Sequence, residues 1–190
     1  MKMKMKSRNR AFSAIAAICM ACMACVTGAA GAEETVDEYP FGLALLPVRY
    51  LEAPGPDSGV WLFRLNLLAG RNRTMTGLDV GSVCNWTSGD AAGLAFAGVC
   101  NVCRGEGAGI QVACLNSTER AHAGLQLGAG NMTWGIRGAQ LGVVNATSEG
   151  YGLQVGVVNL AESFSGLQLG LMNMNLASPL PMTPVLNVWF

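Results

Sequence analysis

A nearly identical segment occurs seven times in this 190-residue chain, most clearly as Gly-Leu-Gln-Val-Gly-Val-Val-Asn at residues 152–159. Each segment starts at a glycine: Gly77, Gly93, Gly109, Gly124, Gly138, Gly152 and Gly166. The spacing between these glycines falls from 16 to 15 and then to 14 residues along the chain. Self-similarity at a short period is typical of architectures built from one repeated unit. The repeat therefore constrains the fold more than any single residue does.

Within each repeat, branched apolar residues alternate with small or polar residues, as Leu153 and Val155 do with Gln154 between them. A period of two predicts a β-strand with one apolar face and one polar face. The polar face carries one recurring position: Asp79, Ala95, Gln111, Gln126, Gln140, Gln154 and Gln168. The Asn that ends each repeat precedes turn-forming residues, so we expect it to start a turn.

The N-terminus has the features of a bacterial secretory signal peptide. Five Lys and Arg residues occur in the first ten positions, an apolar run covers residues 11–26, and Ala30-Gly31-Ala32 offers a cleavage site. This pattern predicts cleavage after Ala32 and export to the bacterial outer membrane or cell surface. A lipid-modified Cys25 is the minor alternative.

The remaining 158 residues are enough for one domain. We expect an acidic N-terminal tail at 33–40 and a single β domain at 41–190, with the repeats at 77–173 and a terminal strand at 184–190. After residue 32 the chain contains seven Arg and twelve Asp plus Glu residues, a net charge of −5. No basic patch remains for nucleic acid, so we predict no nucleic-acid partner.

Charge distribution favours a small antiparallel up-and-down β-barrel of about ten strands, of the outer-membrane type. Asp79 is the only charged residue between the Gly and the Asn of any repeat, and the other charges of the array lie in connections. A transmembrane barrel presents such an apolar face to lipid and keeps small or polar residues inside. The barrel predicts a structural protein or narrow pore, with membrane lipid and the barrel-assembly machinery as partners.

The alternative is a parallel β-solenoid with one repeat per coil, which would be a secreted binding or adhesive surface protein. Identical residues would then stack in ladders along the array. The two folds differ at Cys84 and Cys100, which end successive repeats. They would lie ~25 Å apart in a barrel but at the ~4.8 Å strand spacing in a solenoid. The barrel therefore predicts that no Cys84–Cys100 disulfide forms.

Residues capable of chemistry are few. His122 is the only histidine, and no catalytic motif, cofactor loop or metal-ligand spacing is present. We therefore predict a non-enzymatic protein with no catalytic, cofactor-binding or metal-binding residues. The cysteines after the signal peptide (Cys84, Cys100, Cys103 and Cys114) are interpreted as small apolar residues, and their disulfide status is left open.

Repeats such as Gly-Ala-Gln-Leu-Gly-Val-Val-Asn at 138–145 resemble the GVQIG or GLQLGVVN-type surface repeats of uncharacterised exported proteins in spirochaetes and Bacteroidetes. The resemblance extends from the run-in at 63–70 to the Pro-containing segment before Phe190. It implies placement at the cell surface or outer membrane and no known reaction. The ending, with Leu186, Val188 and Phe190 on one face, also resembles the C-terminal strand of outer-membrane barrels, although Val188 replaces the aromatic residue often found there.

Overall fold

The computed structural model describes residues 36–47 and 50–190, and the predicted signal peptide and most of the acidic tail lie outside these residues. The described chain is built from β-strands, and it contains no helix that is long and apolar enough to cross a membrane. The strands are β1 (Glu38–Ala44), β2 (Glu52–Ala53), β3 (Gly59–Asn66), β4 (Ala69–Asn72), β5 (Thr74–Gly81), β6 (Cys84–Thr87), β7 (Ala91–Ala97), β8 (Cys100–Cys103), β9 (Gly107–Val112), β10 (Leu115–Leu127), β11 (Gly130–Leu141), β12 (Val144–Val155), β13 (Val158–Asn175) and β14 (Met182–Trp189).

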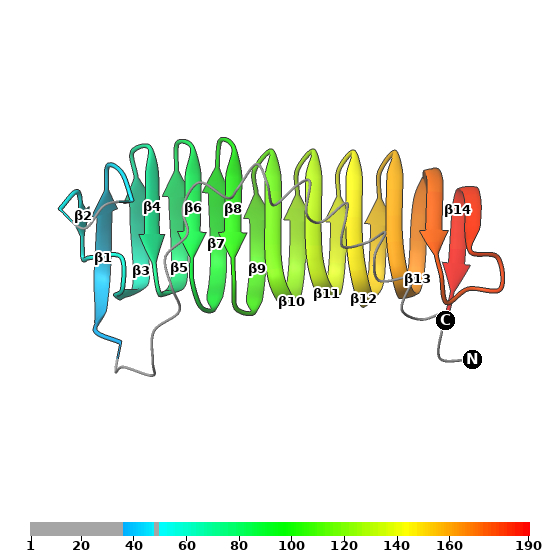
Figure 1. Cartoon of the computed structure of the whole chain (residues 1–190), viewed down its shortest axis with the longest axis horizontal. Coiled ribbons are helices and arrows are strands. Elements are labelled where there is room, and N and C mark those ends of the chain that lie inside the picture. The colour runs from blue at the N-terminus through cyan, green and yellow to red at the C-terminus, as the bar shows by residue number, and fades with distance from the viewer. Residues whose placement is uncertain (1–35, 48–49) are drawn as a thin grey trace, which may run out of the picture. The chain divides into compact units, whose positions relative to one another are not determined.

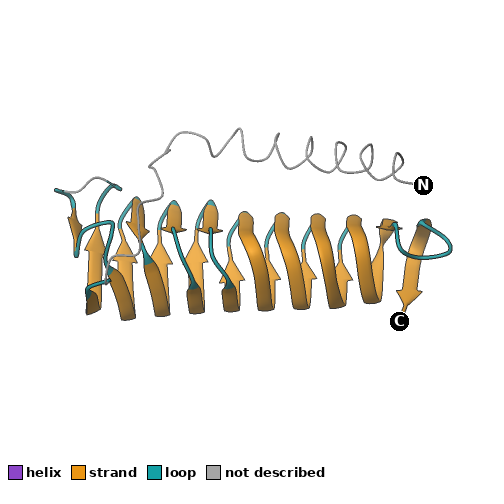
Figure 2. Cartoon of the chain, turned by 60° about the horizontal axis from the view of Figure 1, so that its bottom comes forward, coloured by secondary structure: helices purple, strands orange, loops and turns teal. Residues whose placement is uncertain are grey.

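Residues 36–47 and 50–190 form a parallel β-solenoid of two strand layers (Figures 1 and 2). The first layer runs in the order β1, β3, β5, β7, β9, then the second halves of β10 to β13, and finally β14. The second layer contains β4, β6, β8 and the first halves of β10 to β13. In the later coils one long strand bends from the second layer into the first, with a register shift between Thr118 and Ala121 in β10. One repeat therefore makes one coil.

The prediction of an antiparallel barrel is wrong, and the alternative fold is the one observed. Neighbouring repeats pair in parallel throughout the array, and antiparallel pairs among the described strands occur only at its ends, between β1 and β2 and between β13 and β14. Cys84 and Cys100 lie directly opposite each other, with a Cα–Cα distance of 4.7 Å, and form a disulfide. The expected absence of this bridge is also wrong. Successive coils superpose, which brings equivalent residues to the strand spacing.

Polar ladders run through the interior beside a small apolar cluster of Ile136, Ala161 and Phe164, and the alternating apolar residues of the repeats point outward. Gln126, Gln140 and Gln154 are each fully buried, and each donates its side-chain N–H to the Gln of the coil before it at 2.7–2.9 Å. The predicted sidedness, with Gln inside and the branched residues outside, is confirmed. Hydrogen-bonded stacking satisfies amides that would be costly to bury alone.

The Asn residues that end the repeats form a second buried ladder, so the expectation that they act only as turn residues is incomplete. Asn131, Asn145 and Asn159 are at most 2% exposed. Asn145 donates to Oδ1 of Asn159 at 2.8 Å and to the carbonyl of Val155 at 2.9 Å. Each Asn thus joins its coil to the next and satisfies a backbone acceptor at the corner between layers.

The glycine that starts each repeat is required by backbone geometry. All seven have positive φ, between 106° and 142°, where side chains are strongly disfavoured. A Cβ at Gly152 would lie 2.0 Å from the carbonyl oxygen of Gly138 in the preceding coil. Only glycine allows the coils to approach this closely while the chain turns into the first layer.

Both ends of the array are covered by short antiparallel strands. β2 pairs with β1, and β14 pairs with β13 over the predicted terminal strand segment. At the β1 end, the buried Arg64 guanidinium donates to Glu52 at 3.2 Å and to Oδ1 of Asn66 at 2.9 Å. Asp79 pairs with Arg64 in strand register and accepts a hydrogen bond from Asn66 at 2.8 Å. The polar interior thus begins with a charged cluster rather than with glutamines.

Candidate binding surface

Two apolar ladders cover the outer face of the first layer, and we call this surface the apolar face. Its first ladder contains Phe41, Phe63, Leu78, Leu94, Ile110, Leu125, Ala139, Leu153, Leu167 and Val188. Its second ladder contains Leu43, Leu65, Val80, Phe96, Val112, Leu127, Leu141, Val155, Leu169 and Leu186. Each ladder takes one residue from each of ten adjacent strands, and every residue is apolar.

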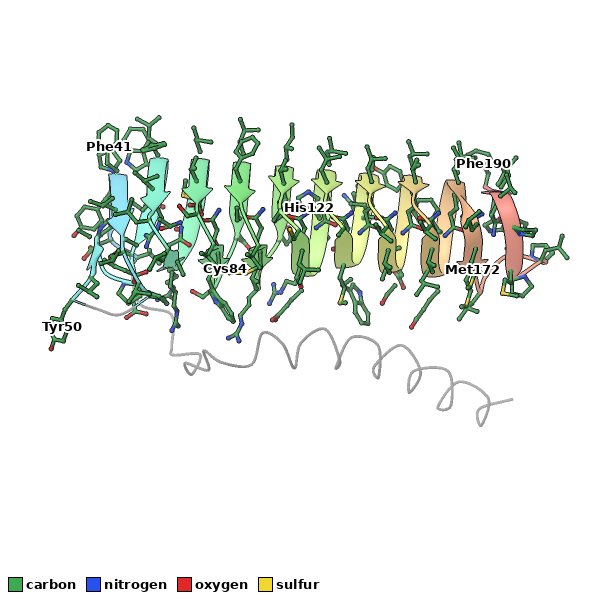
Figure 3. All side chains as sticks on the ribbon, turned by 90° about the horizontal axis from the view of Figure 1, so that it is seen from above. Phe41, Tyr50, Cys84, His122, Met172 and Phe190 are labelled. Atoms are coloured by element: carbon green, nitrogen blue, oxygen red, sulfur yellow. A yellow bond between two sulfur atoms is a disulfide. The ribbon has the colours of Figure 1, made fainter. Side chains whose placement is uncertain are left out.

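The side chains of the apolar face remain accessible at the centre of the array as well as at its ends. Leu94 and Phe96 in β7 are 41% and 40% exposed, although neighbouring coils pack against them on both sides. Phe41 and Phe190 lie at opposite ends of the same side of the array, and His122 lies inside it (Figure 3). Parallel sheets are normally covered on both faces, so an open apolar face of this length is unusual.

An apolar ridge borders this face at the corner where the chain leaves the first layer. Val99, Val143 and Val157 are 43–51% exposed, and Leu171 is 74% exposed. Equivalent corner residues of successive coils are hydrogen-bonded, as the Val157 N–H is to the Val143 carbonyl at 2.9 Å. The ridge therefore has the same axial repeat as the two ladders. The sequence pattern gave no reason to separate these residues from the strands, because they continue the same apolar alternation.

A cation–π contact and a surface salt bridge lie elsewhere on the coil. The Arg104 guanidinium carbon lies 4.9 Å from the Trp86 ring centroid, and Arg104 pairs with Glu119 at 3.4 Å. Trp134 is 62% exposed at the bend between layers. These contacts are surface interactions of small energy. They place the hydrated surface of the solenoid away from the apolar face.

An open trough of about 730 Å³ runs beside the apolar face over β5, β7 and β9. Its floor includes Ala92, Ala108 and Ala123, which occupy one register position, and Trp61 and Arg137 lie toward its two ends. The trough forms because these residues are small. In a later coil a larger residue, Tyr151, occupies the same register position. It supplies space next to the apolar face but no enclosed chamber for chemistry.

The residues whose side chains could take part in chemistry are spread along the chain rather than clustered. Cys103 is buried, which raises the pKa of its thiol to about 11, whereas Cys114 is exposed. His122 is fully buried, and burial lowers its pKa because the charged imidazolium loses hydration. Among residues 36–47 and 50–190, no group of three or more His, Cys, Asp or Glu residues is placed to hold a metal ion.

No protein-family model, curated protein or solved structure matches the chain. The resemblance to exported surface-repeat proteins therefore stays a prediction from the sequence.

Proposed function

We propose that this chain is an exported, non-enzymatic β-solenoid of the bacterial surface whose apolar face is a binding surface. The observation that supports the proposal is the pair of continuous apolar ladders, which contain no charged residue over ten strands. An apolar surface of this extent is a common mark of an interaction site. The basic and apolar N-terminal segment supports export.

The earlier expectation of a narrow pore depended on the barrel and is not part of this proposal. Membrane lipid and barrel-assembly machinery were expected as partners for the same reason, and the solenoid gives them no support. A regular array of equivalent coils is instead suited to a partner that repeats with the same spacing, because each coil contributes an equivalent contact.

Fractionation of producing cells together with surface rebinding tests this proposal. We expect the protein in the medium or on the outer surface, released without detergent, and we expect fluorescently labelled protein to rebind to washed cells. The variant Leu94→Glu/Phe96→Glu places carboxylates on the apolar face and should abolish rebinding. The control Trp134→Glu/Met172→Glu changes two exposed residues outside both ladders and should rebind normally. Equal rebinding by both variants would exclude the apolar face as the binding surface.

A further inference from the structure

We propose that the apolar face binds the same face of a second copy of this chain, giving a closed face-to-face dimer. This inference rests on the proposed function, because it names the partner of that binding surface. Four observations on the described residues support it: the dimensions of the face, its axial repeat, the position of the charges and the ends of the array.

The apolar face and the adjoining apolar ridge together have the area that a stable protein interface requires. Ten adjacent strands at ~4.8 Å give a face ~43 Å long. Its width, from the first ladder to the apolar ridge, is about four residues at ~3.3 Å each plus side-chain reach, or ~16 Å. The product is roughly 700 Å² per copy, close to the ~800 Å² per partner of a standard interface.

The axial repeat of the face is matched by a second copy. Leu125, Leu153 and Leu167 belong to a ladder whose rungs are spaced by the sheet hydrogen bonds. A second chain presents the same spacing, so its rungs can pack between these rungs along the whole length, at the ~10 Å separation of stacked sheets. A lipid surface has no such repeat to match.

The charges also favour a second copy over an anionic bilayer. After the predicted signal peptide the chain contains seven Arg and twelve acidic residues. Binding of an amphipathic surface to anionic lipid normally depends on flanking Lys and Arg residues. Here Arg137 lies in the row beside the first ladder, and the same register position holds Ala123 and Tyr151 in the neighbouring coils. An apolar centre with a mixed rim is instead the usual anatomy of a protein interface.

The ends of the array favour a closed assembly rather than a fibre. Unpaired strand edges promote edge-to-edge growth. β14 runs antiparallel to β13 and contains Pro184, which has no backbone N–H to donate, so the last strand does not repeat the edge of a coil. β2 pairs with β1 at Leu43 and Ala44 and occupies part of the other edge. Association through the apolar face buries the same patch on both copies, which is the closed geometry of a two-fold dimer.

Sedimentation velocity of the secreted protein, purified without detergent, tests the inference. We expect the mass of two chains, unchanged in high salt because the contact is apolar. Leu94→Glu/Phe96→Glu should have the mass of one chain and retain the β-sheet circular dichroism spectrum, while Trp134→Glu/Met172→Glu should remain a dimer. A single-chain mass for the unaltered protein at ~100 µM, far above a typical Kd for an interface of this area, would overturn the inference.

Further measurements distinguish failure of the inference from failure of the proposed function. If Leu94→Glu/Phe96→Glu does not fold, hydroxyl-radical labelling of the unaltered protein should modify Leu125 and Leu153 less at high than at low protein concentration, while Trp134 and Met172 are modified equally at both concentrations. Modification of Leu125 and Leu153 that does not change with concentration over the range where dimer forms would contradict the dimer. A single-chain protein that still rebinds to cells through the apolar face would reject the second copy but retain the proposed function. A dimer whose rebinding does not depend on this face would retain the inference and reject only the attachment to cells through this face.

Discussion

Asn145 donates its side-chain N–H to Asn159 in the next coil at 2.8 Å, and this donation points toward the C-terminus. In the other buried ladder the direction is reversed, because Gln154 donates to Gln140 in the preceding coil at 2.7 Å. The amide dipoles of the two ladders therefore oppose each other inside the same coil. Side-chain amides in this solenoid perform the cohesive role that apolar contacts perform in most cores.

Replacing Asn145 with Ala should destabilise the protein strongly. The change removes the acceptor for Asn131 and the donors to Asn159 and to the Val155 carbonyl, all of them buried. Unsatisfied buried groups cost about 1–3 kcal/mol each, so we expect a loss of about 3 kcal/mol or more in the free energy of unfolding. Urea denaturation measures it. The neighbouring Val143→Ala, at a half-exposed ridge position, should cost less than 1 kcal/mol.

Gly152→Ala should be among the most damaging small substitutions. The residue has φ of 128°, and the added Cβ would lie 2.0 Å from the Gly138 carbonyl oxygen. Backbone atoms of two coils would have to separate, and we expect a cost of about 3 kcal/mol or more. Gly55→Ala is the matched control, because no heavy atom lies within 4 Å of a Cβ built there. Similar melting temperatures for both variants would contradict this account of the repeat glycine.

The sequence predicted the strands, the sidedness of their faces and the equivalence of the repeats, but not the direction of neighbouring strands. A period of two is the same in parallel and antiparallel sheets. Drift of the repeat length from 16 to 14 residues argued against superposed coils. In the structure the additional residues of the early coils lie in connections such as 88–90, between β6 and β7, so Gly77 still pairs with Gly93. Insertions at a corner leave the ladders in register.

The apolar face was recognised in the sequence, but it was attributed to the outer surface of a barrel, and the fold is a solenoid. Charge-free strands were attributed to a lipid environment because a solenoid in water usually hydrates its outer face. The structure shows that the interior is polar, with Gln140 and Asn145 both fully buried. Sequence alternation identifies which residues share a face, whereas the partner of that face depends on the tertiary arrangement.

Ala95→Gln should stabilise the protein by completing the Gln ladder. Ala95 lies between Asp79 and Gln111 in register, where later coils carry Gln. A cavity of about 20 Å³ borders these three residues. A Gln here could accept from Gln111 and donate to Asp79, and we expect a gain of about 1 kcal/mol. Ala92→Gln, in the open trough, is the control and should have little effect on thermal unfolding. A loss of stability in Ala95→Gln would show that the coil cannot accommodate the side chain.

The thiols should differ sharply in accessibility. Cys84 and Cys100 are joined, Cys103 is buried with its pKa raised to about 11, and Cys114 is exposed. Maleimide should label one thiol of the native protein, two after denaturation and four after denaturation with reduction, if cleavage has removed the signal-peptide cysteines. Mass spectrometry counts the labels, and the Cys114→Ser variant should lose only the label that the native protein accepts. Four labels without reductant would contradict the disulfide.

Asp79 should make the protein more stable at moderately acidic pH than above neutrality. Burial raises the pKa of its carboxyl to about 7 from 3.8, and the nearby Arg64 offsets this only in part. Between these values the folded chain retains a proton that the unfolded chain releases, so stability falls as pH rises toward 7. Each pKa unit corresponds to 1.36 kcal/mol, which gives up to about 4 kcal/mol. In Asp79→Asn, chemical denaturation at several pH values should no longer show this fall.

His122 should have the opposite effect on stability to Asp79. Its pKa is lowered in the folded chain, so the unfolded chain takes up a proton first as pH falls through about 6.5, and stability falls with pH. The ring is fully buried, and the backbone groups of Gly109 and Leu125 beside it offset the lowering of its pKa only in part. His122 shares its register position with Ile136, so His122→Ile should be accommodated and should raise stability most at acidic pH. On lowering the pH from 6.5 to 5, we expect Asp79→Asn to lose stability, His122→Ile to gain it, and the unaltered protein to change by an amount between those of the two variants. Parallel curves for all three proteins would show that neither buried group titrates as the structure requires.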